Sequence, residues 1–188
     1  MTTQPTDAEA PLRYTQTARL LHWIVALMVI ATLPVGSIMQ QRGLARPTQD
    51  LLFILHKNGG VIILALVIAR LVWRALNPAP PMPASVPPLQ ALVARLAHWA
   101  LYAMLIFMPV TGYVRVRAGG FPVEMLDRWG VPALVPRSDA LAETAKAAHY
   151  WGRYVLVALI LAHVGAAIYH GVVRRDGVFS RIWPPLGR

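Results

Sequence analysis

Cysteine is absent from the 188-residue sequence. Its absence excludes disulfide bonds, cysteine-ligated iron–sulfur clusters, thioether-linked prosthetic groups and a thiol nucleophile. Acidic residues are also scarce, with 8 Asp and Glu against 18 Lys and Arg, and none lies in the four long apolar stretches. A proton or cation transporter usually carries an acidic residue at mid-membrane depth, so this class of protein is disfavoured. A Walker loop, a dinucleotide-binding fingerprint and a hydrolase nucleophile elbow are missing as well.

Charged residues of both signs make up only 14% of the chain, whereas an ordinary soluble domain carries about a quarter. The formal net charge is nevertheless +10. In a soluble chain this excess of basic residues would suggest a nucleic-acid partner. Here the basic residues flank apolar stretches, where such residues contact anionic lipid head groups or the carboxylates of a cofactor. We therefore expect membrane lipid as a partner and no nucleic acid.

The apolar residues form four runs that are long enough to cross a membrane. Hydrophobic residues make up 56% of the chain, and the runs of roughly twenty residues match a hydrocarbon core about 30 Å thick. The sequence thus predicts an all-α membrane protein, a four-helix transmembrane bundle that forms one domain over residues 13–185. A flexible polar tail, which does not resemble a signal peptide, is expected at residues 1–12. The predicted spans are 18–39, 51–76, 92–114 and 147–173.

The connections between the spans differ in length and composition. Residues 77–88 are rich in proline and read as a stiff linker, and the segment V-E-M-L-D-R-W within 115–145 is a candidate interfacial helix. An even number of spans places both termini on one side of the membrane. Nine Lys and Arg fall on each side, which leaves the positive-inside comparison tied, although the long loop weighs less per charge and favours cytoplasmic termini.

All six histidines lie in or at the edge of the predicted spans, where ionisable residues are functional candidates. His149 and His163 are fourteen residues apart in the fourth span, which is close to four helical turns and about 21 Å of rise. Both therefore point from nearly the same face, one near each membrane surface. His56 matches the depth of His149, and His22 roughly matches that of His163. The pattern predicts two inter-helix histidine pairs at opposite ends of the bundle.

Two facing imidazoles are what a six-coordinate haem iron requires, one on each side of the flat macrocycle. Gly60, one turn after His56, leaves room for a porphyrin. Arg19, Lys57 and Arg153 lie within a turn of three of the histidines and are candidates to contact haem carboxylates. Other interpretations remain open, because glycine also favours close helix packing in membranes and long basic side chains reach toward lipid head groups.

The remaining two histidines have no assigned role. His98 opens the third span and either sits at the interface or lines a quinone pocket. His170 lies on the same face as His163 and is a rival ligand, but its neighbour Arg174 places it in the head-group region. A zinc site is disfavoured, because zinc needs three or four ligands at one place and these histidines separate toward two ends.

Five motifs together resemble the bacterial cytochrome b561 family, within the wider group of membrane cytochrome b subunits of hydrogenases and formate dehydrogenases. They are R-L-L-H-W-I in the first span, H-K-N-G-G in the second, the A-P-P-x-P linker, A-H-W-A-L-Y in the third and H-x13-H-x6-H in the fourth. The resemblance covers Arg13 to Pro185. It implies two non-covalent haem b groups, one held by His22 and His163 on the cytoplasmic side and one by His56 and His149 on the periplasmic side. It further implies a multi-pass protein of the bacterial inner membrane with cytoplasmic termini.

The resemblance also implies a function. We expect an oxidoreductase that transfers electrons through the haems between an outer donor, such as superoxide, and the ubiquinone pool; no catalytic residue is assigned. One alternative is a cytochrome b anchor subunit that receives electrons from a redox partner protein in a larger respiratory complex. A second is an ion or metal carrier that uses the histidines without haem.

Overall fold

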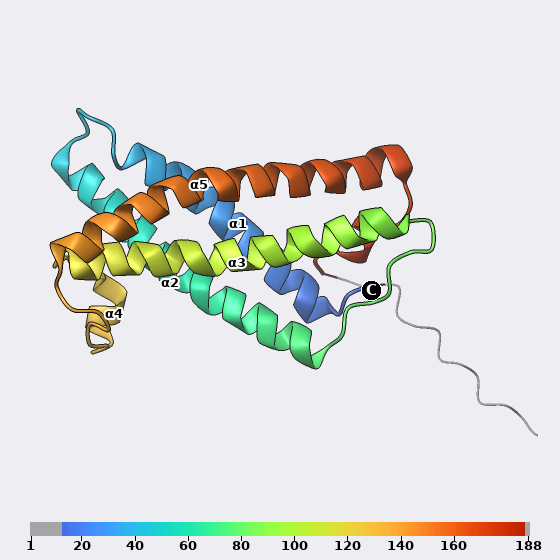
Figure 1. Ribbon diagram of the computed structural model, residues 1–188, viewed down its shortest axis with the longest axis horizontal. Coiled ribbons are helices and arrows are strands. Elements are labelled where there is room, and N and C mark those ends of the chain that lie inside the picture. The colour runs from blue at the N-terminus through green and yellow to red at the C-terminus, as the bar shows by residue number, and fades with distance from the viewer. Residues whose placement is uncertain (1–12, 187–188) are drawn as a thin grey trace, which may run out of the picture.

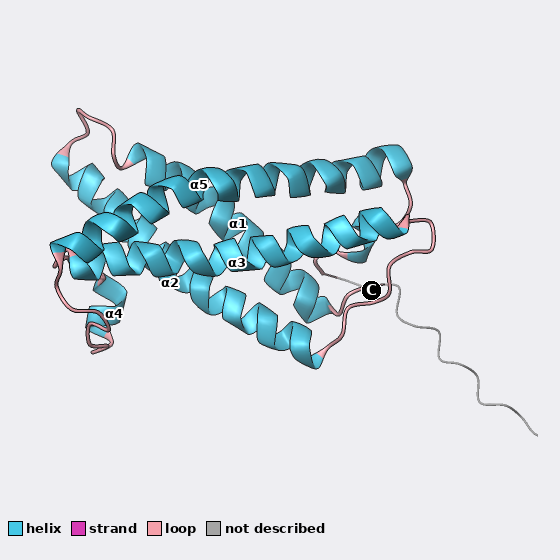
Figure 2. Cartoon of the chain, viewed as in Figure 1, coloured by secondary structure: helices cyan, strands magenta, loops and turns pink. Residues whose placement is uncertain are grey.

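Four long helices run along the length of the molecule in the computed structural model, which describes residues 13–186 (Figure 1). All four are long and apolar enough to cross a membrane, and the described residues contain no strand (Figure 2). This confirms the predicted fold class. The tail expected at residues 1–12 lies outside the described residues. The helices are α1 (Gln16–Ile38), α2 (Arg46–Leu76), α3 (Pro88–Ala118) and α5 (Asp139–Ile168), and α5 continues into a π-helical turn, η1 (Tyr169–Arg174).

The helices extend beyond the apolar runs because local signals outside those runs define their ends. The side chain of Thr15 accepts a hydrogen bond from the backbone of Ala18 and caps α1, and Ser138 caps α5 through Leu141 in the same way. The sequence between Ser138 and the predicted fourth span is rich in alanine, the residue with the highest helix propensity. For this reason α5 starts eight residues before position 147.

The helices associate in two neighbouring pairs. α3 packs along α5 and α1 along α2, while the contact between α2 and α3 joins the pairs. We call one end of the bundle the terminal end. It contains the start of α1, the linker 77–87 and the short helix η2 (Phe179–Arg181). We call the other end the loop end. It contains the α1–α2 turn and α4 (Glu124–Arg128), which is the short helix expected in the long connection.

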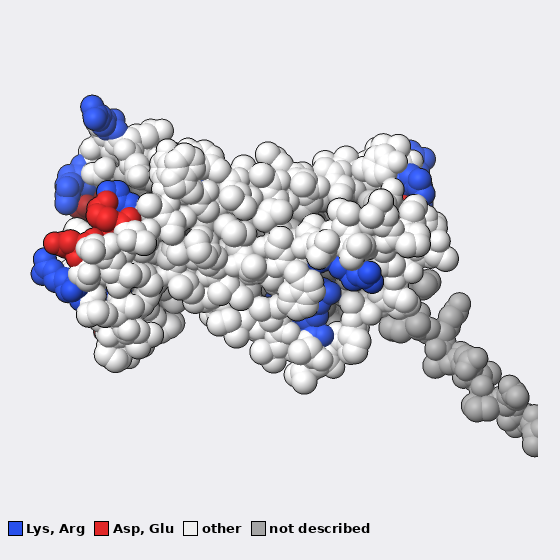
Figure 3. All heavy atoms as spheres, viewed as in Figure 1, with Lys and Arg blue, Asp and Glu red and all other residues white. Residues whose placement is uncertain are grey.

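The middle of the bundle is apolar both inside and outside. Val25, Val29, Ile63 and Val67 form a buried cluster with Tyr102, and Val67 is completely inaccessible to solvent. The outer surface also carries large apolar side chains, and on the face that Figure 3 shows, an uncharged band separates charged residues gathered toward the two ends. A helical bundle with this surface buries its middle in lipid and keeps its ends in water.

Candidate functional site

Four histidines face one another inside the bundle in two pairs, one toward each end. At the loop end the ring centroids of His56 from α2 and His149 from α5 are 6.1 Å apart. At the terminal end the ring centroids of His22 from α1 and His163 from α5 are also 6.1 Å apart. These are the residues that depth and helical phase place together in the sequence.

The spacing of the rings has a chemical meaning. An imidazole nitrogen binds a metal ion at about 2 Å, and the centre of the ring lies roughly 1 Å further back. Two axial imidazoles on one iron therefore have ring centres about 6 Å apart. Both pairs have this separation, so the residues fit a metal-centred group held between helices.

Hydrogen bonds at the loop end determine which nitrogen of each imidazole carries the proton. His56 Nδ1 donates to the backbone oxygen of Thr32 at 3.2 Å, and His149 Nδ1 donates to the backbone oxygen of Met108 at 3.0 Å. A carbonyl oxygen only accepts, so Nδ1 must hold the proton in both rings. Nε2 is then left with a free lone pair, as in metal-ligating histidines whose second nitrogen donates to the protein.

Two glycines that the sequence analysis missed make this contact with the backbone possible. A Cβ at Gly36 would lie 2.6 Å from Cε1 of His56, and a Cβ at Gly112 would lie 3.1 Å from Cε1 of His149. Gly36 lies four residues after Thr32, and Gly112 lies four residues after Met108, whose carbonyls accept from the two histidines. Because neither glycine has a side chain, the imidazole can approach the helix backbone at this place. The sequence does contain a pattern that could have identified them, because Gly36 and Gly112 each follow a histidine of their own helix by fourteen residues.

The terminal-end pair has different neighbours. Arg70 Nη1 lies 2.6 Å from His22 Nδ1, and Arg70 Nε donates to the hydroxyl of Tyr102 at 2.8 Å. His98 from α3 also faces the interior, with its ring centroid 5.4 Å from that of His163. His98 is therefore part of this cluster.

A cavity of about 800 Å³ opens from the loop-end histidines toward the surface. His56, His149 and Gly60 line it, and a Cβ at Gly60 would meet nothing within 4 Å. A cavity of this size is suited to a cofactor or ligand of several hundred daltons. Open space thus lies beside Gly60, at the position proposed from the sequence to leave room for a porphyrin.

The three cations expected near the haem carboxylates have partners within the chain. Arg19 is 4% exposed and donates to the backbone oxygen of Pro184 at 2.8 Å. Arg153 lies over the rings of Tyr150 and Tyr154, 4.2 and 4.6 Å from their centroids. Lys57 Nζ pairs with the carboxylate of Glu124 at 2.5 Å and donates to the backbone oxygen of Pro122 at 2.8 Å.

His170 forms an ion-pair contact of 2.6 Å with Asp176, which lies just beyond η1. Burial raises the pKa of the Asp176 carboxyl, but the hydrogen bond with His170 and a backbone hydrogen bond from Val178 outweigh it, so this pKa is lowered overall. The contact holds His170 at the terminal end, away from the two histidine pairs.

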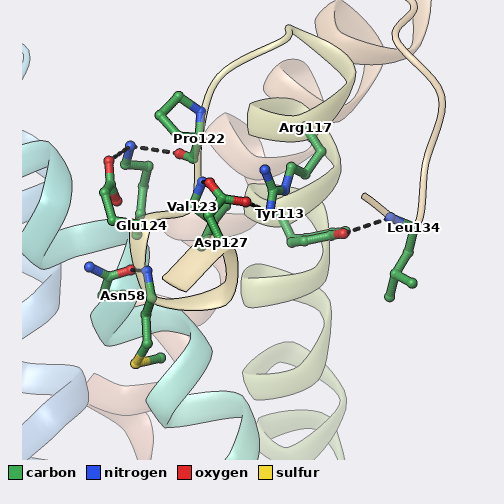
Figure 4. Close-up of polar contacts among 10 residues, drawn as sticks. Asn58, Tyr113, Arg117, Pro122, Val123, Glu124, Asp127 and Leu134 are labelled. Atoms are coloured by element: carbon green, nitrogen blue, oxygen red, sulfur yellow. Dashed lines mark hydrogen bonds and ion pairs between the residues drawn. The ribbon is translucent and has the colours of Figure 1, made fainter. Parts of the chain in front are cut away.

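The long connection folds over the loop end and is fastened to two spanning helices (Figure 4). Besides the contact between Lys57 and Glu124, the backbone N–H of Met125 donates to Asn58 of α2 at 3.1 Å. Arg117 of α3 donates to Asp127, and this hydrogen bond is the main reason that the pKa of the Asp127 carboxyl lies below its usual range. The connection thus covers one side of the mouth of the cavity.

Four membrane-spanning helices that hold facing imidazoles between them are the arrangement of a membrane cytochrome b. Comparison with known families agrees. A family model described as prokaryotic cytochrome b561 matches residues 13–185. The chain belongs to this family.

Relatives cover the chain almost from end to end. It is 30% identical over 173 residues to cytochrome b561 homolog 2 of Escherichia coli K12, with 92% of each chain covered. It is 28% identical over 170 residues to the probable superoxide oxidase CybB of Yersinia pestis, covering 87% of this chain and 92% of the relative. The protein is thus a b-type cytochrome and an oxidoreductase of the bacterial membrane that transfers electrons across the bilayer, in a family that acts with quinones.

Proposed function

We propose that the chain binds two haem b groups without covalent attachment, one between His22 and His163 and one between His56 and His149. The observation that carries this proposal is the 6.1 Å separation of the ring centroids in both pairs, which matches two axial imidazoles on one iron. The proton on Nδ1 of His56 and His149 supports it, because it leaves Nε2 free at the loop end.

Arg19, Lys57, Arg153 and Gly60 are the further proposed haem contacts. The three cations would approach haem carboxylates, and Gly60 would leave space for the macrocycle beside His56. Lys57 supports this role best, because it lines the cavity together with the loop-end histidines. We also propose cytoplasmic termini in the inner membrane, so that the loop end faces the periplasm.

The proposed reaction takes electrons from superoxide at the loop end and delivers them to ubiquinone. Its support is the similarity to a probable superoxide oxidase. Two superoxide anions would each give up one electron and leave as dioxygen. A ubiquinone that takes both electrons together with two protons would leave as ubiquinol.

The chain would contribute the histidine ligands, the position of the proton on the loop-end imidazoles and an apolar layer between the two haem sites. Bound haem supplies a site that accepts and releases a single electron. Gly36 and Gly112 allow the loop-end imidazoles to reach backbone carbonyls and keep their protons on Nδ1. The cluster around Val67 fills the layer between the two pairs with apolar side chains, which excludes water and ions from the middle of the bundle.

The first test is the haem content of purified protein in detergent. We expect a reduced-minus-oxidised spectrum of a b-type cytochrome and two haems per chain. His56→Ala and His149→Ala should each leave one haem, and it should be the same one by absorption and midpoint potential. His170→Ala, which removes a histidine held by Asp176 away from both pairs, is the matched control and should keep two. The absence of a b-type absorption band would contradict the haem proposal. If the two single variants lose different haems, the proposed pairing of His56 with His149 is wrong.

The second test is the reaction. Wild-type protein given enzymatically generated superoxide should become reduced, and added ubiquinone should reoxidise it with formation of ubiquinol. Heat-inactivated superoxide source is the control. Haem that superoxide cannot reduce would contradict the proposed donor and would favour the anchor-subunit interpretation, in which a partner protein supplies the electrons.

A further inference from the structure

The two histidine pairs occupy equivalent positions in the bundle but differ in the residues that lie next to the imidazole rings. On every spanning helix two interior positions lie fourteen residues apart, one at each level of the bundle: His22 and Gly36 on α1, His56 and Arg70 on α2, His98 and Gly112 on α3, His149 and His163 on α5. At the loop end the other two positions are both glycine. At the terminal end they are Arg70 and His98.

Arg70 is the one permanent charge among these eight positions. Its guanidinium touches His22 at 2.6 Å and is held from the other side by the hydroxyl of Tyr102 at 2.8 Å. Tyr102 is itself 7% exposed and belongs to the apolar core, so it fixes the guanidinium against the bundle interior. No carboxylate in the described part of the chain forms an ion pair with Arg70.

A ligating His22 changes the contact with Arg70 but leaves the charge in place. A neutral imidazole that gives one nitrogen to iron carries its proton on the other, whereas a guanidinium can only donate. Arg70 would then have no acceptor on His22, and its Nε bond to Tyr102 would keep the guanidinium beside the ring. An arginine does not lose its proton in a protein, so a full positive charge remains beside the ring.

We propose that Arg70 makes the two haem sites unequal by favouring the reduced state of the haem at the terminal end. This inference rests on the proposed binding of two haems. A nearby positive charge stabilises the haem with one electron more, because that state carries one positive charge less. The effect is strong here because the apolar cluster that contains Tyr102 screens it little. Arg74 and Arg181 also act on His98 at the terminal end, whereas Arg70 contacts a proposed ligand, His22, directly.

At the loop end the protein acts in the opposite sense. Imidazoles that donate to backbone carbonyls become more basic ligands, which favours the oxidised metal. Arg115 acts on both imidazoles through space and Arg153 acts on His149, but neither arginine makes a hydrogen bond to these rings within the described residues. An electron therefore moves downhill from the loop end to the terminal end, and no bond forms or breaks on the way.

The test is a spectroscopic redox titration of Arg70→Gln in full-length protein in detergent, with midpoint potential and haem content as the readouts. We expect the ferrous–ferric equilibrium of one haem to shift at least tenfold toward ferric, which is about 59 mV for a one-electron couple. The other haem should shift less than threefold. Arg70→Lys keeps the charge and should restore most of the potential. Arg95→Gln, at an exposed position of α3, is the matched control and should leave both potentials within threefold of wild type.

A second background identifies the haem. In His149→Ala only the terminal-end haem should remain, and Arg70→Gln added to it should produce the full shift. Wild type and His149→Ala with equal haem content would overturn the two-haem proposal and this inference with it. Two haems and unchanged potentials in Arg70→Gln would overturn the inference alone. If Arg70→Gln loses haem, Arg70→Lys decides. A midpoint potential near that of wild type supports the inference, and one lowered by about 59 mV, a tenfold shift of the equilibrium, rejects it.

Discussion

At the scale of single residues, the loop-end pair depends on two positions that have no side chain. Gly36 and Gly112 expose the carbonyls of Thr32 and Met108, and these carbonyls hold the histidine protons on Nδ1. A methyl group at either position would compete with an imidazole for the same volume. The two glycines are not equivalent, because the Cβ would lie 2.6 Å from the ring at Gly36 and 3.1 Å from it at Gly112.

Gly36→Ala should therefore cost the loop-end haem more than Gly112→Ala does. We expect Gly36→Ala to lose at least half of that haem, because the half-buried ring of His56 must shift, while Gly112→Ala retains most of it. Gly165→Ala is the matched control on α5, since its Cβ would meet nothing within 4 Å. The measurement is haem per chain by absorbance. Equal haem retention in all three variants would show that these glycines do not position the histidines.

The residues that sequence reasoning found and missed differ in how unusual they are in a membrane. A histidine at membrane depth is costly and attracts attention by itself, so all four proposed ligands are visible in the chain. Glycine is common in transmembrane helices, and Gly36 and Gly112 gain meaning only when the opposing ring is known. Arg70 lies near the end of its apolar run and looks like any flanking arginine that reaches toward head groups.

At the scale of elements, hydropathy determines the number of helices but not which helix packs against which. The prediction of four spanning helices is confirmed because each helix is long and apolar enough to cross the hydrocarbon core. The close packing of α3 along α5 is not visible in hydropathy. It depends on small contact residues such as Gly152, where a Cβ would lie 2.8 Å from the sulfur of Met108.

The connection that contains α4 is attached to the spanning helices partly by charged groups, so removing a charge tests this attachment. Asp127 accepts from Arg117 and from the backbone of Val123, and its pKa is lowered chiefly by the hydrogen bond from Arg117. A carboxyl with a lowered pKa in the folded state stabilises the attachment at neutral pH, and this contribution disappears only as the pH falls below the ordinary value of 3.8. We expect no change in attachment between pH 5 and 8 on this account.

Asp127→Asn removes the same charge at pH 7. It should increase the rate of tryptic cleavage after Arg128 several-fold, because Arg117 no longer holds the carboxylate in place. Asp50→Asn is the matched control, since Asp50 pairs with Arg46 on the exposed surface at this end. The measurement is the appearance of the cleaved fragment over time in detergent. Unchanged cleavage in Asp127→Asn would mean that the other contacts of α4 hold the connection alone.

At the scale of the whole molecule, segments far apart in sequence close the terminal end. Arg181 is 6% exposed, donates to the backbone oxygens of Pro80 and Pro81, and lies 5.4 Å from the ring centroid of Tyr14. The backbone N–H of Tyr14 in turn donates to the oxygen of Arg181. One buried arginine thus connects the start of the first helix, the proline-rich linker and the C-terminal segment.

Removal of this arginine should loosen the terminal end while leaving the loop end intact. Arg181→Ala leaves one buried and one partly buried prolyl carbonyl without their donor, and a hydrogen bond from a charged group contributes about 2 kcal/mol. For a chain of this size that loss corresponds to a fall of about 4–8 °C in the unfolding midpoint. Thermal unfolding of the detergent-solubilised protein, followed by tryptophan fluorescence, measures it, with exposed Arg95→Ala as the control. Because the loop-end histidines lie about 21 Å along the helix axis from the terminal-end pair, their haem should keep its wild-type potential in Arg181→Ala. A midpoint equal to that of Arg95→Ala would show that the three segments are held by apolar packing and not by the buried charge.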